Sequence, residues 1–374
     1  MDIKKKKILF LIPNLAHGGA EKVLVNLVNN INKDKFEVYL QTLFDVGVNK
    51  QYINEEIHYL GGSKHMFRGN TIVMKLFSPR KLFSYLIKDN FDIIISYLEG
   101  PTARIVSGCI NSKTKLVSWI HIEQHTAKVA SGCFRSYKEA FDCYSKFDRT
   151  ICVSNTVKED FSKIFDLPKP IDVFYNTNES DNILKLSEEK VDDIAFDNDV
   201  FNLISVAKIV PSKGYDRLIR IHKKLLDDGI KNHVYILGIG EEQEKYEKYL
   251  KDNNLENSFT FIGFRDNPYK YVKCADLYVC SSRREGFSTA VTEALIVGTP
   301  VVSTNCSGAY ELLGYNNEYG IVTDNNEESL YEGIKRMLSE KDLLNKYRHQ
   351  AKIRGKEFTT DKTVRAVENM FLEL

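Results

Sequence analysis

Short apolar runs alternate with amphipathic stretches along the whole of this 374-residue chain. From Ala20 to Ile31, for example, apolar residues recur at helical spacing and give a predicted helix one apolar face. In the first half, apolar runs predict strands at residues 7–12, 37–43, 92–97, 115–120 and 150–153. Strands that alternate with helices in this way predict βαβ units and a largely parallel sheet.

A polar and acidic stretch from Asn176 to Val200 interrupts this alternation. Strands are then expected at residues 202–209, 234–238, 260–264, 276–281 and 300–304, with helices at 215–228 and 241–253. The chain length also suits two domains. We therefore predict an α/β protein with doubly wound domains at residues 1–178 and 201–356 and a linker at 179–200. A final helix, residues 357–374, is expected to pack back on the first domain.

The composition is that of a soluble globular protein, with 43% hydrophobic and 28% charged residues. A net charge of +1 does not favour a nucleic-acid partner, although the first half is net basic and could face an anionic surface or substrate. The seven cysteines lack CxxC spacing, so we expect reduced thiols in the cytoplasm rather than disulfides or a zinc site. The first apolar run is too short for a signal peptide, and no run is long enough to span a membrane.

Two strand-to-helix turns are candidate phosphate sites, because doubly wound sheets bind ligands outside the carboxyl ends of their strands. Gly18 and Gly19 precede a helix whose free N–H groups suit a phosphate, although a plain tight turn is an equal alternative. They do not form the GxGxxG motif of dinucleotide sites. Lys208 and Lys213 follow another strand and could hold a diphosphate without metal. Solvated surface lysines are the alternative.

Two acids stand eight residues apart in the segment RREGFSTAVTE. Glu285 follows a strand, whereas Glu293 lies in an apolar helical stretch. Ala290 occupies the position where a capping box would need Ser or Thr, so Glu293 has no routine capping role. Helical side chains lean toward the helix start, so we expect both carboxylates at one pocket, where they can accept hydrogen bonds from sugar hydroxyls. Two structural acids bonded to backbone amides are the alternative.

A histidine, His121, follows the strand expected at residues 115–120. A lone histidine at such a place is more often a satisfied core or rim residue than a functional one. His17, His125 and His222 lack the spacing of metal ligands, so we expect no metal site and no cofactor.

In their order along the chain, these features resemble the retaining glycosyltransferases of family 4, in particular those of bacterial cell-surface polysaccharides. The resemblance rests on GGAEKVLVNL, VAKIVPSKGYDRLI and REGFSTAVTEALIVGTPVVST. It implies the GT-B fold, in which two Rossmann-like domains face each other across a cleft. It also implies metal-independent transfer of a hexose or N-acetylhexosamine, with retention, from a nucleotide-diphosphate sugar, most simply a UDP-sugar. The acceptor would be a saccharide or a lipid-linked cell-envelope glycan.

The resemblance further implies roles for individual residues. Lys208 and Lys213 would bind the donor diphosphate. Glu285 would hold hydroxyls of the transferred sugar, and Glu293 the nucleotide ribose. His121 would line the reaction centre and act in catalysis with Lys213 and Glu285. Further substrate contacts would come from Gly18 and Gly19 at the diphosphate, from Gly286, Phe287, Ser288 and Thr289 at the sugar and phosphate, and from Gly263, Phe264 and Arg265 at the base.

Three other functions share some of these features. A GT-B sugar-nucleotide epimerase or phosphorylase would have the same fold and nucleotide pocket, but the REGFSTAVTEAL segment is typical of the transferases. An NAD-dependent dehydrogenase would also be doubly wound, but the chain lacks GxGxxG. A carbohydrate-binding protein without activity would not need the phosphate-binding positions.

Residues 61–88 contain six Lys and Arg residues, no Asp or Glu, and many aromatic and aliphatic residues. This mixture is typical of a protein surface that lies on an anionic membrane. We therefore predict that the segment docks the protein on the inner face of the cell membrane. The alternative is that these apolar residues form the core faces of ordinary helices, with solvated lysines.

Overall fold

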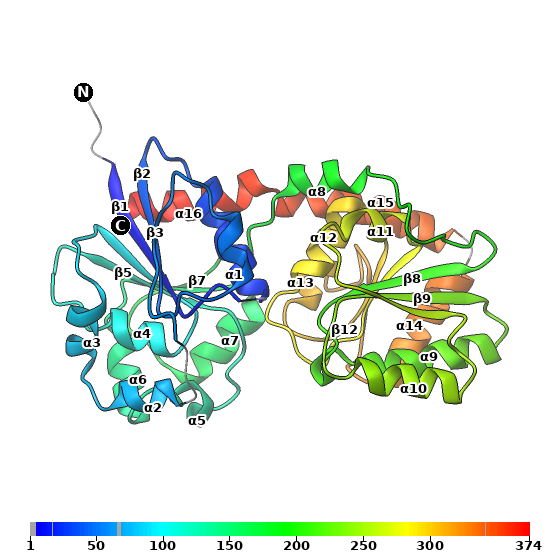
Figure 1. The fold of residues 1–374 in the computed structure, drawn as a ribbon, viewed down its shortest axis with the longest axis horizontal. Coiled ribbons are helices and arrows are strands. Elements are labelled where there is room, and N and C mark those ends of the chain that lie inside the picture. The colour runs from blue at the N-terminus through cyan, green and yellow to red at the C-terminus, as the bar shows by residue number, and fades with distance from the viewer. Residues whose placement is uncertain (1–4, 17, 66–68, 341) are drawn as a thin grey trace. The chain divides into compact units, whose positions relative to one another are not determined.

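The computed structural model describes residues 5–16, 18–65, 69–340 and 342–374. The chain divides into two compact units, one formed by Met1–Asn178 with Thr360–Leu374 and the other by Glu179–Thr359. Each unit contains one parallel sheet with helices packed around it (Figure 1). The predicted α/β class with two doubly wound sheets is confirmed.

The sheet of the first unit has the strand order β3-β2-β1-β4-β5-β6-β7. Its strands are β1 (Lys6–Ile12), β2 (Phe36–Thr42), β3 (His58–Leu60), β4 (Ile93–Tyr97), β5 (Lys115–Ile120), β6 (Arg149–Cys152) and β7 (Ile171–Val173). The strand order reverses between β1 and β4, and ligands bind at such a reversal in doubly wound sheets. The side chains of β1 from Ile8 to Ile12 are fully buried, because helices cover both faces of a parallel sheet.

The helices of the first unit range in length from 4 to 14 residues. They are α1 (Gly19–Asn30), η1 (Val48–Tyr52), α2 (Asn70–Lys75), α3 (Pro79–Leu86), α4 (Pro101–Val106), α5 (Ala127–Ala130), α6 (Tyr137–Tyr144), α7 (Asn155–Ile164) and α16 (Thr360–Glu373). In the described part of the whole chain, no helix combines the length and the apolar character that a membrane span needs.

The sheet of the second unit has the strand order β10-β9-β8-β11-β12-β13. Its strands are β8 (Phe201–Val206), β9 (Asn232–Leu237), β10 (Phe259–Gly263), β11 (Leu277–Cys280), β12 (Val301–Thr304) and β13 (Ile321–Thr323). Its helices are α8 (Ser180–Ser187), η2 (Pro211–Lys213), α9 (Tyr215–Asp227), α10 (Gln243–Asp252), α11 (Tyr269–Cys274), α12 (Thr289–Val297), α13 (Ala309–Leu313), α14 (Glu327–Ser339), α15 (Leu343–Gly355) and η3 (Lys356–Phe358). The order reverses between β8 and β11, so the loops that follow these two strands leave the sheet as neighbours.

Two expectations about the domain boundaries need correction. The segment expected as a linker, residues 179–200, begins with α8, which packs on α11 and α12 and belongs to the second unit. The last helix begins at Thr360 rather than at residue 357, because Phe358 is fully buried in the second unit. From Thr360 onward the chain packs on the first unit, where the Phe371 ring contacts Phe10 and Phe36 edge-on.

Candidate active site

Two loops at the carboxyl edge of the second sheet bring Lys213 and Glu285 together. Lys213 ends η2, which follows β8, and Glu285 lies between β11 and α12. Lys213 Nζ lies 2.7 Å from Glu285 Oε1. The Ser282 hydroxyl donates a hydrogen bond to the same carboxylate oxygen at 2.6 Å. The structure therefore pairs a cation with an acid at the place where the strand order reverses.

Gly214 allows the two loops to approach closely. Its backbone is left-handed, with φ of 68°, and a Cβ at this position would collide with the Ser281 carbonyl oxygen. The Ser281 hydroxyl donates to the Lys213 carbonyl oxygen at 2.8 Å. A larger residue at position 214 would push the Lys213 loop away from the loop that carries Glu285.

The environment of Lys213 favours its charged form. The side chains of Lys213 and Glu285 are 23% and 13% exposed. Burial by itself lowers the pKa of Lys213, but the charge and hydrogen bond of Glu285 outweigh it, so the pKa is raised above its ordinary value. Lys213 is therefore an ammonium at neutral pH and can stabilise negative charge that develops beside it.

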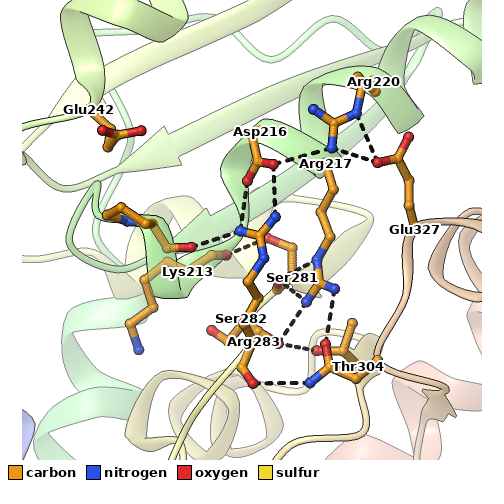
Figure 2. Close-up of polar contacts among 12 residues, drawn as sticks. Lys213, Asp216, Arg217, Arg220, Glu242, Ser281, Ser282, Arg283, Thr304 and Glu327 are labelled. Carbon is orange, nitrogen blue, oxygen red and sulfur yellow. Dashed lines mark hydrogen bonds and ion pairs between the residues drawn. The ribbon is translucent and has the colours of Figure 1, made fainter.

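Arginines support the same loops from α9 and from the β11–α12 connection (Figure 2). Arg283 makes two contacts of 2.8 Å with the Asp216 carboxylate and donates to the Pro211 carbonyl oxygen at 2.7 Å. Arg217 donates to the carbonyl oxygen of Ser281 at 2.8 Å. Sequence reasoning missed these residues, because arginines on a predicted helix and in a loop are usually solvated.

Glu293 is 7% exposed inside α12. The side chain of Ser288 caps this helix by accepting a hydrogen bond from the Val291 N–H. The Tyr269 hydroxyl of α11 donates to Glu293 Oε1 at 3.3 Å. Lys213 and Ser282 contact Glu285 instead, and a pocket shared by Glu285 and Glu293 stays a prediction.

The backbone from Gly286 to Thr289 connects the two acids. Phe287 is 5% exposed and packs edge-on against Phe358, with ring centroids 5.9 Å apart. Gly308 leaves room for the Phe287 ring, because a Cβ at Gly308 would press against it. Packing at Phe287 therefore holds the segment that we expect to contact the sugar and phosphate.

Lys208 and Phe264, from the turn at residues 263–265, are exposed, unlike Lys213 and Glu285. Lys208 is exposed, and its ammonium forms no ion pair within the described ranges. Phe264 is 53% exposed, and Arg265 pairs with Asp193, which follows α8, at 3.0 Å. The structure gives Lys213 an acid as its partner, so the convergence of Lys208 with Lys213 and the base-binding role of the turn stay predictions.

His121 follows β5 and is 9% exposed. Burial lowers its pKa to about 3, so its ring is neutral at physiological pH. Its Nε2 has no hydrogen-bond partner among the described residues, and neither do the Tyr97 hydroxyl and the Trp119 Nε1. The Tyr97 ring centroid lies 4.6 Å from that of His121 and 5.2 Å from that of Trp119. Sequence reasoning singled out His121 but missed Tyr97 and Trp119 beside it, whose buried polar atoms also lack partners among the described residues.

Gly18 precedes α1, and Gly19 begins it. A Cβ at Gly18 would collide with the Glu21 carboxylate, which therefore lies over the start of the helix. A negative group is favoured there by the helix dipole, and we predicted that position for a phosphate. The phosphate-binding role of the two glycines stays a prediction, and it requires the Glu21 side chain to turn away.

A group of possible metal ligands occurs in the first unit. Atoms of Glu123, His125 and Asp160 lie within 4.8 Å of one another. The Asp160 carboxylate already accepts hydrogen bonds from the backbone N–H groups of Gln124 and His125, which fasten this loop to α7. The spacing of the histidines did not predict this group, because Asp160 comes from a separate helix. That the protein needs no metal stays a prediction.

Comparisons with known proteins agree with these features. The sequence profile of glycosyl transferases group 1 matches residues 187–357, and that of glycosyltransferase family 4 matches residues 17–177. A relative from Campylobacter jejuni is 30% identical, and the match covers 96% of this chain and 98% of the relative. That protein is N-acetylgalactosamine-N,N'-diacetylbacillosaminyl-diphospho-undecaprenol 4-alpha-N-acetylgalactosaminyltransferase. The chain belongs to glycosyltransferase family 4.

Solved structures show that the glycosyltransferase has the GT-B fold. Anabaena HepE, solved in complex with UDP and glucose, is 18% identical with a TM-score of 0.76, and the match covers 99% of this chain and 100% of HepE. Sucrose-phosphate synthase from Thermosynechococcus elongatus is 13% identical with a TM-score of 0.77, and the match covers 99% of both chains. The epimerase, phosphorylase and dehydrogenase alternatives are not favoured.

Proposed function

We propose that this glycosyltransferase transfers a hexose or N-acetylhexosamine from a UDP-sugar, with retention of configuration and without a metal ion. The observation that carries the proposal is the 2.7 Å contact between Lys213 and Glu285, where the order of the second sheet reverses. Two comparisons support the donor and the sugar. HepE was solved with UDP and glucose, and the Campylobacter relative is named for the α-linked transfer of N-acetylgalactosamine.

In the proposed reaction, the bond between the anomeric carbon and the diphosphate oxygen breaks. The acceptor oxygen forms the new bond on the same face of the sugar, and its proton passes to the departing phosphate oxygen. Because the leaving diphosphate gains negative charge, Lys213 stabilises the transition state more than the ground state. No carboxylate of the protein is then needed as a general base.

Glu285 has two separable tasks in this reaction. Its Oε1 accepts hydrogen bonds from Lys213 and Ser282. Its Oε2 is left to accept hydrogen bonds from hydroxyls of the transferred sugar. Glu285 thereby places the lysine ammonium and the sugar at a fixed separation, which is the kind of positioning that lowers an activation barrier. Glu293 would hold the ribose of the nucleotide.

Removal of metal ions should leave the reaction unchanged. After EDTA treatment and buffer exchange, the initial rate of UDP release should equal that of untreated enzyme, because Lys213 supplies the positive charge at the leaving group. A loss of activity that Mg²⁺ or Mn²⁺ restores would contradict the metal-free mechanism. In that case Glu123→Gln would show whether the group of Glu123, His125 and Asp160 is the metal site.

We also propose that the acceptor is a lipid-linked or polymeric cell-envelope glycan, which the enzyme reaches by resting on the membrane. Exposed apolar residues in the first unit support this. Ile72 and Leu76 of the α2 region are 70% and 74% exposed, and Tyr85 of α3 is 76% exposed. These residues do not form the core faces that the alternative required, although Leu82 does. Met66, Phe67 and Arg68, which belong to the predicted segment, lie outside the described residues.

The backbone at the end of α2 is held by two arginines. Arg104 is 1% exposed and donates to the carbonyl oxygens of Met74 and Phe77 at 2.9 and 2.8 Å. Arg135 donates to the carbonyl oxygens of residues 75 and 76 at 2.6 and 3.1 Å. Four consecutive carbonyl groups at the end of α2 are thus satisfied by side chains. The backbone that carries the exposed Leu76 and Phe77 is therefore held by side-chain hydrogen bonds.

Flotation with liposomes tests the membrane proposal. The enzyme should float with anionic vesicles at low salt and not with neutral vesicles, because each cation near an anionic surface contributes about 1 kcal/mol. Charge reversal at Lys75, Arg80 and Lys81 should abolish flotation without changing UDP affinity. The matched control reverses Lys245, Lys248 and Lys251 of α10, which changes the net charge equally. If the wild-type enzyme fails to float, or if both triple variants float equally, the membrane proposal is wrong.

A further inference from the structure

Arg217 is a buried cation whose hydrogen-bond partners are neutral. It lies in the first turn of α9 and is 4% exposed. Its guanidinium donates to the carbonyl oxygens of Ser281 and Ser282, each at 2.8 Å (Figure 2). It also donates to the Asn325 side-chain oxygen at 2.9 Å. Among the residues described, none of its partners is a carboxylate. Burial lowers the pKa of Arg217 although the charge of the nearby Asp216 opposes this effect. Keeping the guanidinium buried therefore costs free energy that its neutral hydrogen-bond partners offset only in part.

The oxygens that Arg217 binds belong to the loop that carries Glu285. Ser281 and Ser282 directly follow β11, and Glu285 comes three residues after Ser282. Asn325, which Arg217 also binds, donates to the next carbonyl oxygen, that of Arg283, at 3.0 Å. Arg217 thus binds the carbonyl groups of Ser281 and Ser282 directly, and it binds that of Arg283 through Asn325. A planar guanidinium suits this task, because its several donors point in fixed directions.

Arg217 also lies close in sequence to Lys213, the other residue of the contact with Glu285. It is four residues after Lys213, in the helix that η2 and Gly214 lead into. One side chain therefore ties the element that carries Lys213 to the loop that carries Glu285. The contact between these two residues depends on how the two loops are placed, because the loops come from different strands.

We propose that Arg217 is a positioning residue for glycosyl transfer, which holds the Ser281–Glu285 loop against α9 so that Glu285 stays in contact with Lys213. The proposal rests on the roles proposed above for Lys213 and Glu285. Arg217 acts through these residues and does not itself contact the substrate.

Replacement of Arg217 by methionine should lower kcat by about 100-fold, since a displacement of about 1 Å in a reacting group can have an effect of this size. The donor KM should change much less. Arg217→Lys keeps the charge but loses the planar arrangement of donors, so it should recover only part of the loss. The matched control is Lys224→Met. Lys224 also joins α9 to the start of α14, through a 2.8 Å ion pair with Glu328, and this variant should keep the wild-type kcat.

A double-mutant cycle separates positioning from a general structural role. In a Glu285→Gln background, Arg217→Met should lower kcat by less than threefold, because the ion pair that it supports is already lost. A second loss of about 100-fold in that background would overturn the proposal, as would a normal kcat for Arg217→Met alone. If Glu285→Gln and Lys213→Ala are themselves fully active, the proposed roles of these two residues in the reaction are wrong. If they are impaired and Arg217→Met is not, only the positioning role is wrong.

Discussion

Replacement of Lys213 by alanine should lower turnover with the sugar donor by about 10²- to 10³-fold, the usual effect of removing one group that stabilises charge in a transition state. UDP binding should weaken in the same variant, because we propose that the ammonium binds the diphosphate of UDP. The raised pKa of Lys213 keeps this charge in place through the neutral range. Steady-state kinetics with the donor and calorimetry with UDP measure the two effects.

The exposed Lys248 of α10 provides the control for this experiment. Lys248→Ala removes the same charge from the second unit and should leave both kinetics and UDP affinity unchanged. A wild-type turnover number for Lys213→Ala would remove Lys213 from the mechanism. It would also leave the contact with Glu285 as a purely structural ion pair.

The regular elements near this site could be predicted from local sequence pattern. The strands that became β8 and β11 are apolar runs, and the turns after them contain Lys213 and Glu285. The contact between the two residues was not predicted, because it depends on β8 and β11 being neighbours in the sheet. The sequence separates these strands by about 70 positions and by two further strands. Local patterns carry no information on that pairing.

Elements that are short or held by distant contacts could not be predicted. The strands β3, β7 and β13 have three residues each, too few to show a period of two. Helix α8 lies in a polar and acidic stretch, and its packing on α11 and α12 gives it its place in the second unit. Tertiary packing of this kind overrides a weak local preference.

Contacts between polar side chains that form only in the folded chain could not be predicted either. Arg217 is held by carbonyl groups whose positions exist only in the folded chain. The cluster of Tyr97, Trp119 and His121 arises because Tyr97 pairs with Trp119 in the register of β4 and β5. Neither feature has a sequence spacing that marks it, whereas the two acids of the RREGFSTAVTE segment do.

These two acids should separate by role in a binding experiment. Glu293→Gln should weaken free UDP by about 10- to 100-fold, the size expected when hydrogen bonds to a buried charged group worth about 1.5–3 kcal/mol are lost. Glu285→Gln should leave UDP affinity nearly unchanged and mainly lower turnover with the sugar donor, because we propose that its carboxylate binds the sugar rather than the nucleotide. Glutamine is chosen because it keeps the volume of each side chain.

Folding damage must be excluded for Glu293 in particular, since it is 7% exposed and accepts a hydrogen bond from Tyr269. Thermal unfolding of both variants gives this control, and Tyr269→Phe adds a second one by removing the hydroxyl while leaving the acid in place. Calorimetry with UDP on the two glutamine variants then decides the assignment. Equal losses of UDP affinity, with both proteins folded, would contradict the assignment of Glu293 to the ribose and Glu285 to the sugar.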